Sequence, residues 1–91
     1  MDKADKSKLS KLRAQIDSID KNMLKLIKNR FLLTAKIGEI KARNFTPIFD
    51  KKREQEIKFR IRRFCSENNL NPGKITGVFE KILEITRGKN R

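Results

Sequence analysis

Residues 9–44 read LSKLRAQIDSIDKNMLKLIKNRFLLTAKIGEIKARN, and the spacing of the apolar side chains in this stretch predicts the fold. Apart from a gap at position 30, the apolar positions alternate in steps of three and four: Leu9, Leu12, Ile16, Ile19, Met23, Leu26, Leu33, Ile37 and Ile40. This heptad pattern continues without a proline and is typical of one long amphipathic helix. We therefore predict a helix over residues 9–43, and we name its apolar positions the seam.

Arg30 stands in the seam at the place of an apolar residue. A charge on a buried stripe is costly unless an anion or a carboxylate meets it. Lys41 follows about three helical turns later on the same face, about 16 Å along the axis, so Arg30 and Lys41 could bind one small anion. Arg13 lies about 25 Å from Arg30 along the helix and cannot reach that anion. Arg13 is therefore either an ordinary surface cation or part of a site that a second copy of the chain completes.

The predicted helix is too long for a small globular monomer. It would extend about 50 Å, whereas a compact chain of 91 residues has a radius of gyration of about 12 Å. Part of the seam would then remain uncovered in one chain. We predict a homodimer.

The composition limits the possible partners and chemistry. The net charge of +13 favours anionic partners, which are nucleic acid, an acidic membrane surface or an anionic metabolite. The basic residues are scattered and no tyrosine or tryptophan is present for base stacking, so we interpret most of the excess charge as solvated surface.

Histidine is absent and Cys65 is the one cysteine, which excludes histidine-dependent triads, an internal disulfide and Cys/His metal sites. We expect a buried Cys65, no metal and no cofactor.

The remaining residues predict a flexible start and two shorter helices. Residues 1–8 are polar, which predicts a flexible N-terminus without a signal peptide or membrane span, and a cytoplasmic protein. Pro47 ends the long helix, and Asp50 is expected to cap a second helix over 51–67. Asn71 and Pro72 predict the start of a third helix, which runs to about Arg87 and stops at Gly88. The apolar residues expected to face inward are Ile57, Ile61, Phe64, Cys65, Ile75, Val78, Phe79, Ile82 and Ile85.

Five sequence elements occur together and in order. They are Leu12-Arg13 with Ile16-Asp17 and Ile19-Asp20, then Asn29-Arg30, Ile40-Lys41, Pro47-Ile48-x-Asp50, and Arg53-Glu54. With this set, the sequence over residues 9–90 resembles the all-helical chorismate mutase family, without an insertion between the matching positions. The resemblance implies an all-α fold of three helices per chain, intertwined as a homodimer, with a chorismate mutase-like domain over residues 9–91.

The resemblance also implies roles for the cations of the long helix. Arg13, donated across the subunits, and Arg30 match residues that bind the two carboxylates of the substrate. Lys41 matches the cation that donates a hydrogen bond to the ether oxygen of the breaking bond.

Further matching residues come from the other two helices. Asp50, Arg53 and Glu54 match residues around the carboxylate and hydroxyl groups of the substrate, although by themselves they also suit an ordinary capped helix start. Thr86 matches a small hydroxyl residue of the pocket, and its alternative is a hydroxyl bonded to its own backbone. Asn90 stands where the family commonly has a glutamine beside the ether oxygen, and it is one methylene shorter.

The implied reaction is the rearrangement of chorismate to prephenate, an isomerase step of the shikimate pathway in phenylalanine and tyrosine biosynthesis. This concerted step needs no nucleophile, so the absence of histidine is no obstacle.

An isochorismate-pyruvate lyase of the same fold is one alternative function, although such lyases tend to lack an acid matching Glu54. A basic nucleic-acid-binding module is another, but it does not account for Arg30 in the seam. A structural coiled coil would prefer an apolar residue there. We therefore expect a small dicarboxylate as the partner, and neither nucleic acid nor a membrane.

Overall fold

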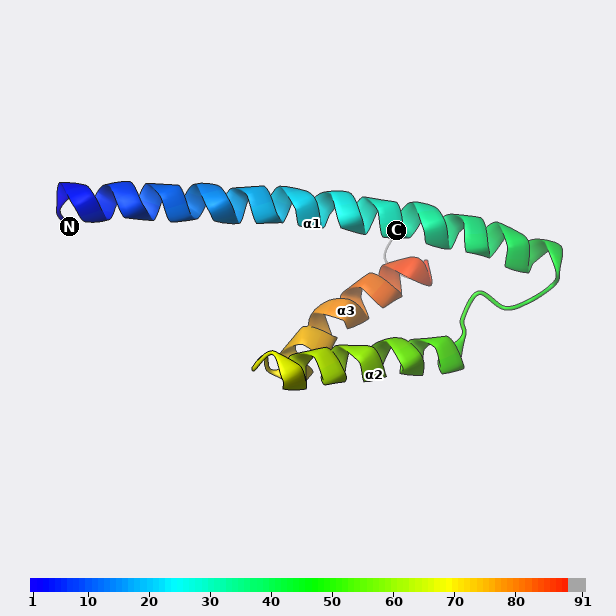
Figure 1. Cartoon of the computed structure of the whole chain (residues 1–91). Coiled ribbons are helices and arrows are strands. Elements are labelled where there is room, and N and C mark those ends of the chain that lie inside the picture. Colours follow the sequence, from blue (N-terminus) through cyan, green and yellow to red (C-terminus); the bar gives the residue numbers. More distant parts are fainter. Residues whose placement is uncertain (89–91) are drawn as a thin grey trace. The chain divides into compact units, whose positions relative to one another are not determined.

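The computed structural model describes residues 1–88, which form three helices and no strand. These are α1 (Lys3–Arg43), α2 (Lys51–Glu67) and α3 (Pro72–Thr86) (Figure 1). The predicted all-helical class is confirmed. The chain divides into two compact units, one of residues 1–32 and one that begins at Leu33.

Helix α1 begins at Lys3, so the predicted start at Leu9 is wrong. The reason is a cap at Asp2. The backbone N–H of Asp5 donates to Oδ1 of Asp2 at 2.8 Å, and the backbone N–H of Lys6 donates to the Asp2 carbonyl at 3.0 Å. These bonds satisfy amide groups that would otherwise have no partner at a helix N-terminus. The flexibility predicted for residues 1–8 stays a prediction.

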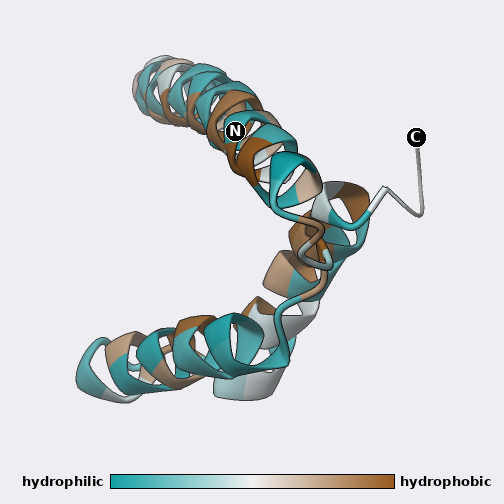
Figure 2. Cartoon of the chain, turned by 90° about the vertical axis from the view of Figure 1, so that its right-hand side faces the viewer, coloured by the Kyte–Doolittle hydropathy of each residue, from teal (hydrophilic) through white to brown (hydrophobic). Residues whose placement is uncertain are grey.

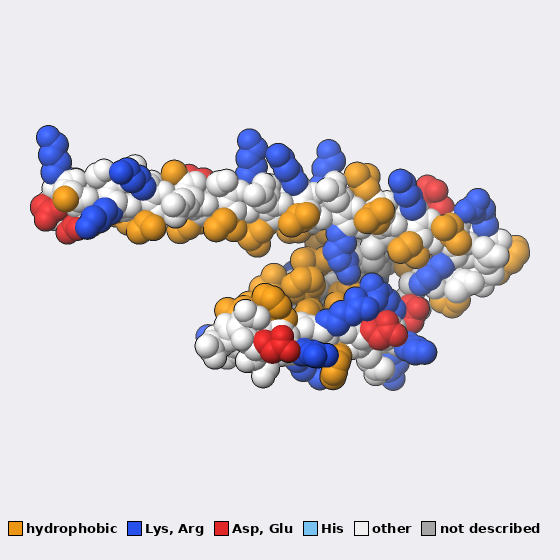
Figure 3. Space-filling model, viewed as in Figure 1, with side chains coloured by type: hydrophobic (Ala, Val, Ile, Leu, Met, Phe, Trp, Pro, Cys, Tyr) orange, Lys and Arg blue, Asp and Glu red, His pale blue; other side chains and the backbone are white. Residues whose placement is uncertain are grey.

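The seam of α1 is exposed. No residue of α1 is buried, and the exposed fractions reach 55% at Leu12, 57% at Ile19 and 66% at Leu26. Figure 2 shows hydrophobic residues recurring along α1, and Figure 3 shows their side chains as a row along one side of this helix. Soluble monomers rarely leave so long an apolar row in water, so the seam is a candidate interface.

Helix α1 ends in a turn that is unusual for its residue. The backbone N–H of Thr46 donates to the Lys41 carbonyl at 2.8 Å, and that of Phe45 donates to the Ala42 carbonyl at 3.2 Å. This pair of bonds forms a Schellman motif, which requires a left-handed residue that is usually glycine. Here Phe45 adopts that conformation, with φ of 52° and a side chain that is 97% exposed. The connector then leads through Pro47 to α2.

Helices α2 and α3 pack against each other and form the core of the second unit. Its buried apolar residues are Ile61, Cys65 and Leu83, and the prediction of a buried Cys65 is confirmed. The inward orientation predicted for Phe64 and Val78 is wrong, since they are 58% and 57% exposed.

The core residues lie on rows of residues spaced four apart, which share one face of a helix. Cys65 lies four residues after Ile61 on such a row, and Leu83 lies four residues after Phe79. Phe64 and Val78 lie beside these rows. Leu83 was not predicted, although Ile75 and Phe79 of the same row were.

The helix ends of the second unit follow the sequence prediction. Oδ1 of Asp50 accepts from the backbone N–H of Arg53 at 3.0 Å, and Oδ1 of Asn71 accepts from the backbone N–H of Lys74 at 3.0 Å. Gly88 has φ of 81° and donates its N–H to the Ile85 carbonyl at 2.9 Å, which ends α3. The bounds predicted for α2 are confirmed, and α3 ends at Thr86.

Candidate active site

A bidentate ion pair joins the two helices of the second unit. Nε of Arg87 donates to Oε2 of Glu54 at 2.7 Å, and a terminal nitrogen of Arg87 donates to Oε1 of the same carboxylate. The two side chains are only 15% and 13% exposed. Glu54 was predicted as a site residue, whereas Arg87 was missed. The only signal in the sequence was a cation directly after Thr86.

Arg87 makes further contacts on both sides of this pair. Its guanidinium lies 5.3 Å from the ring centroid of Phe49, a cation–π distance. Its two terminal nitrogens both lie 3.3 Å from Oε1 of Glu80, and Nζ of Lys58 lies 3.1 Å from Oε2 of Glu80. We name Glu54, Arg87, Glu80 and Lys58 the charge cluster.

The charge cluster shifts the pKa of two side chains, Glu80 and Arg87. The hydrogen bond from Lys58 lowers the pKa of Glu80, and Arg87 acts in the same direction, while partial burial opposes the shift. The hydrogen bond to Glu54 raises the pKa of Arg87 above its usual value. Arg87 is therefore a fixed positive charge at every pH at which the protein is folded.

Lys41 lies in the last turn of α1 and is partly buried. Its Nζ donates to the backbone carbonyl of Ile48 at 3.1 Å. This bond joins the end of α1 to the connector, two residues before Asp50. The ammonium group has two further hydrogens, so Lys41 can bind a ligand oxygen while it keeps this contact.

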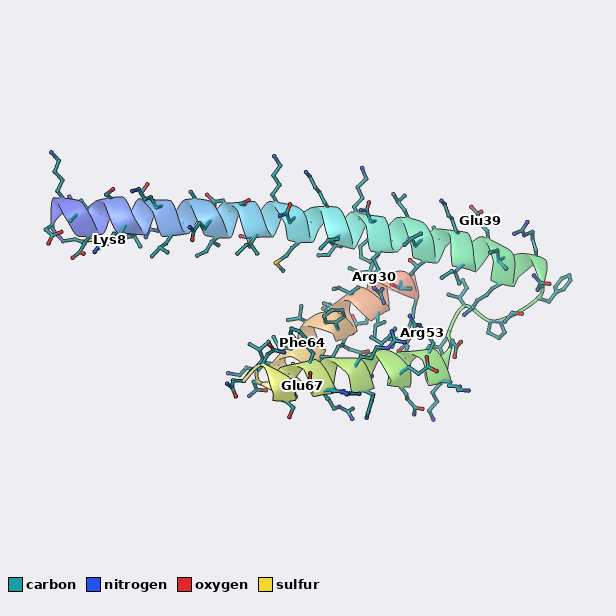
Figure 4. All side chains as sticks on the ribbon, in the orientation of Figure 1. Lys8, Arg30, Glu39, Arg53, Phe64 and Glu67 are labelled. Carbon is teal, nitrogen blue, oxygen red and sulfur yellow. The ribbon has the colours of Figure 1, made fainter. Side chains whose placement is uncertain are left out.

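The first turn of α2 carries two more of the predicted site residues. The carboxylate of Asp50 caps this helix through the amide of Arg53. The guanidinium of Arg53 lies 3.5 Å from Oε2 of Glu56, and both side chains are about half exposed at 52% and 48%. Figure 4 labels Arg53 on this part of α2. Such an exposed pair contributes little to stability, so Arg53 can exchange Glu56 for an anionic ligand at low cost.

The hydroxyl of Thr86 donates to the Ile82 carbonyl at 3.0 Å, which is the alternative considered for this residue. Thr86 directly precedes Arg87, so the ion pair with Glu54 brings this end of α3 to the first turn of α2.

Arg13 and Arg30 belong to the first unit, and both lie on α1. Arg13 is exposed, and Figure 4 labels Arg30. Asn90 lies outside the described residues.

The family model for chorismate mutase type II matches residues 12–90. This match includes every site residue that the sequence predicted. The chain belongs to the type II chorismate mutase family.

Three relatives illustrate the range of this family. A chorismate mutase of Methanocaldococcus jannaschii is 39% identical over 77 residues, which cover 85% of this chain and 78% of the relative. A bifunctional chorismate mutase/prephenate dehydratase of Buchnera aphidicola is 37% identical over 79 residues, which cover 87% of this chain but only 20% of that protein. A 4-amino-4-deoxychorismate mutase of Streptomyces venezuelae is 24% identical, with 87% and 77% covered. No solved structure matches the chain significantly.

The described residues show neither a cluster suited to a metal ion nor a helix suited to span a membrane. Within residues 1–88, no group of three or more histidine, cysteine, aspartate or glutamate residues is arranged to hold a metal ion. None of the helices formed by these residues is both long and apolar enough to cross a membrane.

Proposed function

We propose that this protein rearranges chorismate to prephenate. The observation that carries the proposal is the match to the chorismate mutase type II model over residues 12–90. The relative from Methanocaldococcus jannaschii, with 39% identity, has this activity in its name and supports the same conclusion. The reaction makes the protein an isomerase, and we assign it to the biosynthesis of phenylalanine and tyrosine.

The protein must perform two tasks in this reaction. It holds a flexible dianion in a compact shape in which the reacting carbons approach each other, and it stabilises the negative charge that grows on the ether oxygen. Arg13 and Arg30 suit the first task, because a guanidinium binds a carboxylate through two parallel hydrogen bonds. Lys41 suits the second as a compact charge with free donors.

The other predicted residues complete the pocket. Arg53 adds a cation at the start of α2, and Asp50 and Glu54 supply acceptors for the substrate hydroxyl. Thr86 and Asn90 are proposed to line the pocket from the C-terminal end of the chain. None of these roles requires a cofactor or a metal.

We further propose a homodimer in which Arg13 serves the site of the partner subunit. Two observations support it. The seam of α1 exposes a row of apolar side chains, and Arg13 lies too far along α1 from Arg30 to reach the same ligand within one chain. A second copy of the chain, with the same seam, would cover both rows. The cytoplasmic location stays a prediction.

The decisive assay follows the loss of chorismate absorbance with purified protein and identifies the product. We expect prephenate, and we expect Arg30→Ala to abolish its formation. A parallel assay with isochorismate tests the lyase alternative, since release of pyruvate from isochorismate without turnover of chorismate would replace our proposal. If neither compound reacts, binding to nucleic acid is the next test, and it would weaken steeply with salt.

A further inference from the structure

Arg87 makes the central contacts of the charge cluster, and the sequence assigned it no role. We propose that Arg87 sets the specificity of the site, by neutralising Glu54 so that the site selects a substrate hydroxyl over a cationic amine. This inference rests on the proposed function, because it takes Glu54 as the acceptor of the substrate hydroxyl. It concerns the choice between chorismate and its 4-amino analogue, in which an amine replaces that hydroxyl.

The geometry leaves Glu54 free to bind substrate while Arg87 holds it. A carboxylate has about four lone-pair positions on its two oxygens, and Arg87 occupies one on each. A substrate hydroxyl can therefore still donate to Glu54. The bidentate contact fixes the plane of the carboxylate and hence the direction in which its remaining lone pairs point. Arg87 is in this respect a positioning residue.

The electrostatics of the charge cluster oppose an ammonium ion. Glu54 and Glu80 carry two negative charges, and Arg87 and Lys58 carry two positive charges, so the cluster is neutral. A neutral substrate hydroxyl needs only the carboxylate of Glu54 as an acceptor, and the guanidinium of Arg87 does not repel it. An ammonium group at Glu54 would gain from one carboxylate but would also lie beside the guanidinium, in a partly buried place where repulsion is stronger than in water.

Arg87 is held in this position by three contacts. Its guanidinium stacks on Phe49 at 5.3 Å, pairs with Glu54 and contacts Glu80 at 3.3 Å. Its side chain is only 15% exposed, so it does not swing freely into water. An incoming ammonium group therefore cannot displace the guanidinium without breaking all three contacts.

The competing explanation is that Arg87 only ties α3 to α2. A purely structural role would lower the activity toward both substrates by the same factor. A role in specificity changes the ratio of the two kcat/KM values, which a general loss of folded protein does not alter. This ratio is the quantity to measure.

The experiment uses the full chain as wild type and as Arg87→Met, Arg87→Lys and Lys81→Met, with chorismate and 4-amino-4-deoxychorismate as substrates. Lys81→Met is the matched control, since it removes the same charge from α3 at a side chain that is 73% exposed and outside the cluster. We expect Arg87→Met to shift the ratio at least about tenfold toward the amine, because the unneutralised Glu54 then attracts it. Arg87→Lys keeps the charge but loses the bidentate contact, so we expect it to shift the ratio less than Arg87→Met does. An unchanged ratio in Arg87→Met would overturn the proposal.

A measurement on wild type alone keeps the proposal testable if Arg87→Met does not fold. Raising the pH from about 7 to about 9.5 increases the neutral fraction of an aliphatic amine such as that of the analogue. We expect the kcat/KM of the analogue to rise relative to that of chorismate, because the neutral amine is no longer repelled. A relative value that stays unchanged or falls would show that the ammonium group is not repelled, and it would refute the role of Arg87. If wild type converts neither compound, the proposed function itself fails, which is a different outcome from an unchanged ratio.

Discussion

The guanidinium of Arg87 binds both carboxylate oxygens of Glu54, across 33 positions of the sequence. This contact joins the residue after α3 to the first turn of α2, next to the helix cap made by Asp50. Glu54, which the family resemblance places at the substrate, is thus held by Arg87, to which the resemblance assigns no role. We expect this contact to affect the stability of the second unit and, as proposed above, the choice of substrate.

The ion pair between Arg87 and Glu54 should contribute measurably to stability. Arg87→Met leaves a carboxylate that is 13% exposed without its main partner. We expect the free energy of unfolding to fall by about 2 kcal/mol, the range for a lost hydrogen bond to a charged group. Urea denaturation measures it, with Lys81→Met as a control that should change stability by less than about 0.5 kcal/mol. Equal stability of the two variants would mean that the ion pair does not persist in solution.

Lys41 should be essential for turnover. Removal of one preorganised donor typically raises the barrier by about 3–4 kcal/mol, so Lys41→Ala should lower kcat at least about a hundredfold. Lys36→Ala, which removes an exposed cation of the same helix, should leave the rate unchanged. Near-normal turnover of chorismate by Lys41→Ala would contradict the assignment.

Phe45 should be replaceable by glycine with a gain in stability. Its φ of 52° is a left-handed conformation that costs a bulky residue about 1–2 kcal/mol, and its ring is 97% exposed. We expect Phe45→Gly to raise the free energy of unfolding by about 1 kcal/mol. Asn69→Gly is the control, because asparagine already tolerates its φ of 55° and little should change. A large loss of stability in Phe45→Gly would show that the ring packs against a second copy of the chain.

The charge cluster predicts a pH dependence of stability. The pKa of Glu80 is lowered from its ordinary value of 4.5 by Lys58 and Arg87. Between the lowered and the ordinary value the unfolded chain binds more protons, so stability falls as the pH falls through this range. Wild type and Glu80→Gln, compared by thermal unfolding between neutral and acid pH, should therefore converge in stability at acid pH. Parallel curves would contradict the role of Glu80.

Local signals in the sequence predicted much of the fold. Asp50 and Asn71 cap the helices that they were expected to cap, because a cap depends on residues three positions apart. Features that depend on distant residues were missed. The packing of α3 on α2 decides that Leu83 is buried and that Phe64 is exposed. Arg87 reaches Glu54 only once this packing has formed, and a contact across 33 positions leaves no local signal in the sequence.

For the candidate site, too, the sequence predicted some features and the structure added others. The sequence motif predicted Glu54 and Lys41 as site residues, and the structure adds the contacts of each within the second unit. Their roles at the substrate stay predictions. The position of Asn90 also stays a prediction, because this residue lies outside the described part of the chain.

The most direct test of a chorismate mutase site shared between two copies is a mixing experiment. Arg13→Ala and Arg30→Ala are each inactive if both cations are required. In a hybrid dimer, one site takes the intact Arg30 of the first variant and the intact Arg13 of the second. After unfolding and refolding an equal mixture, half of the dimers are hybrids with one complete site each. We therefore expect about a quarter of the wild-type rate of prephenate formation. No activity in the mixture, with both variants folded, would contradict a site that Arg13 completes from the partner subunit.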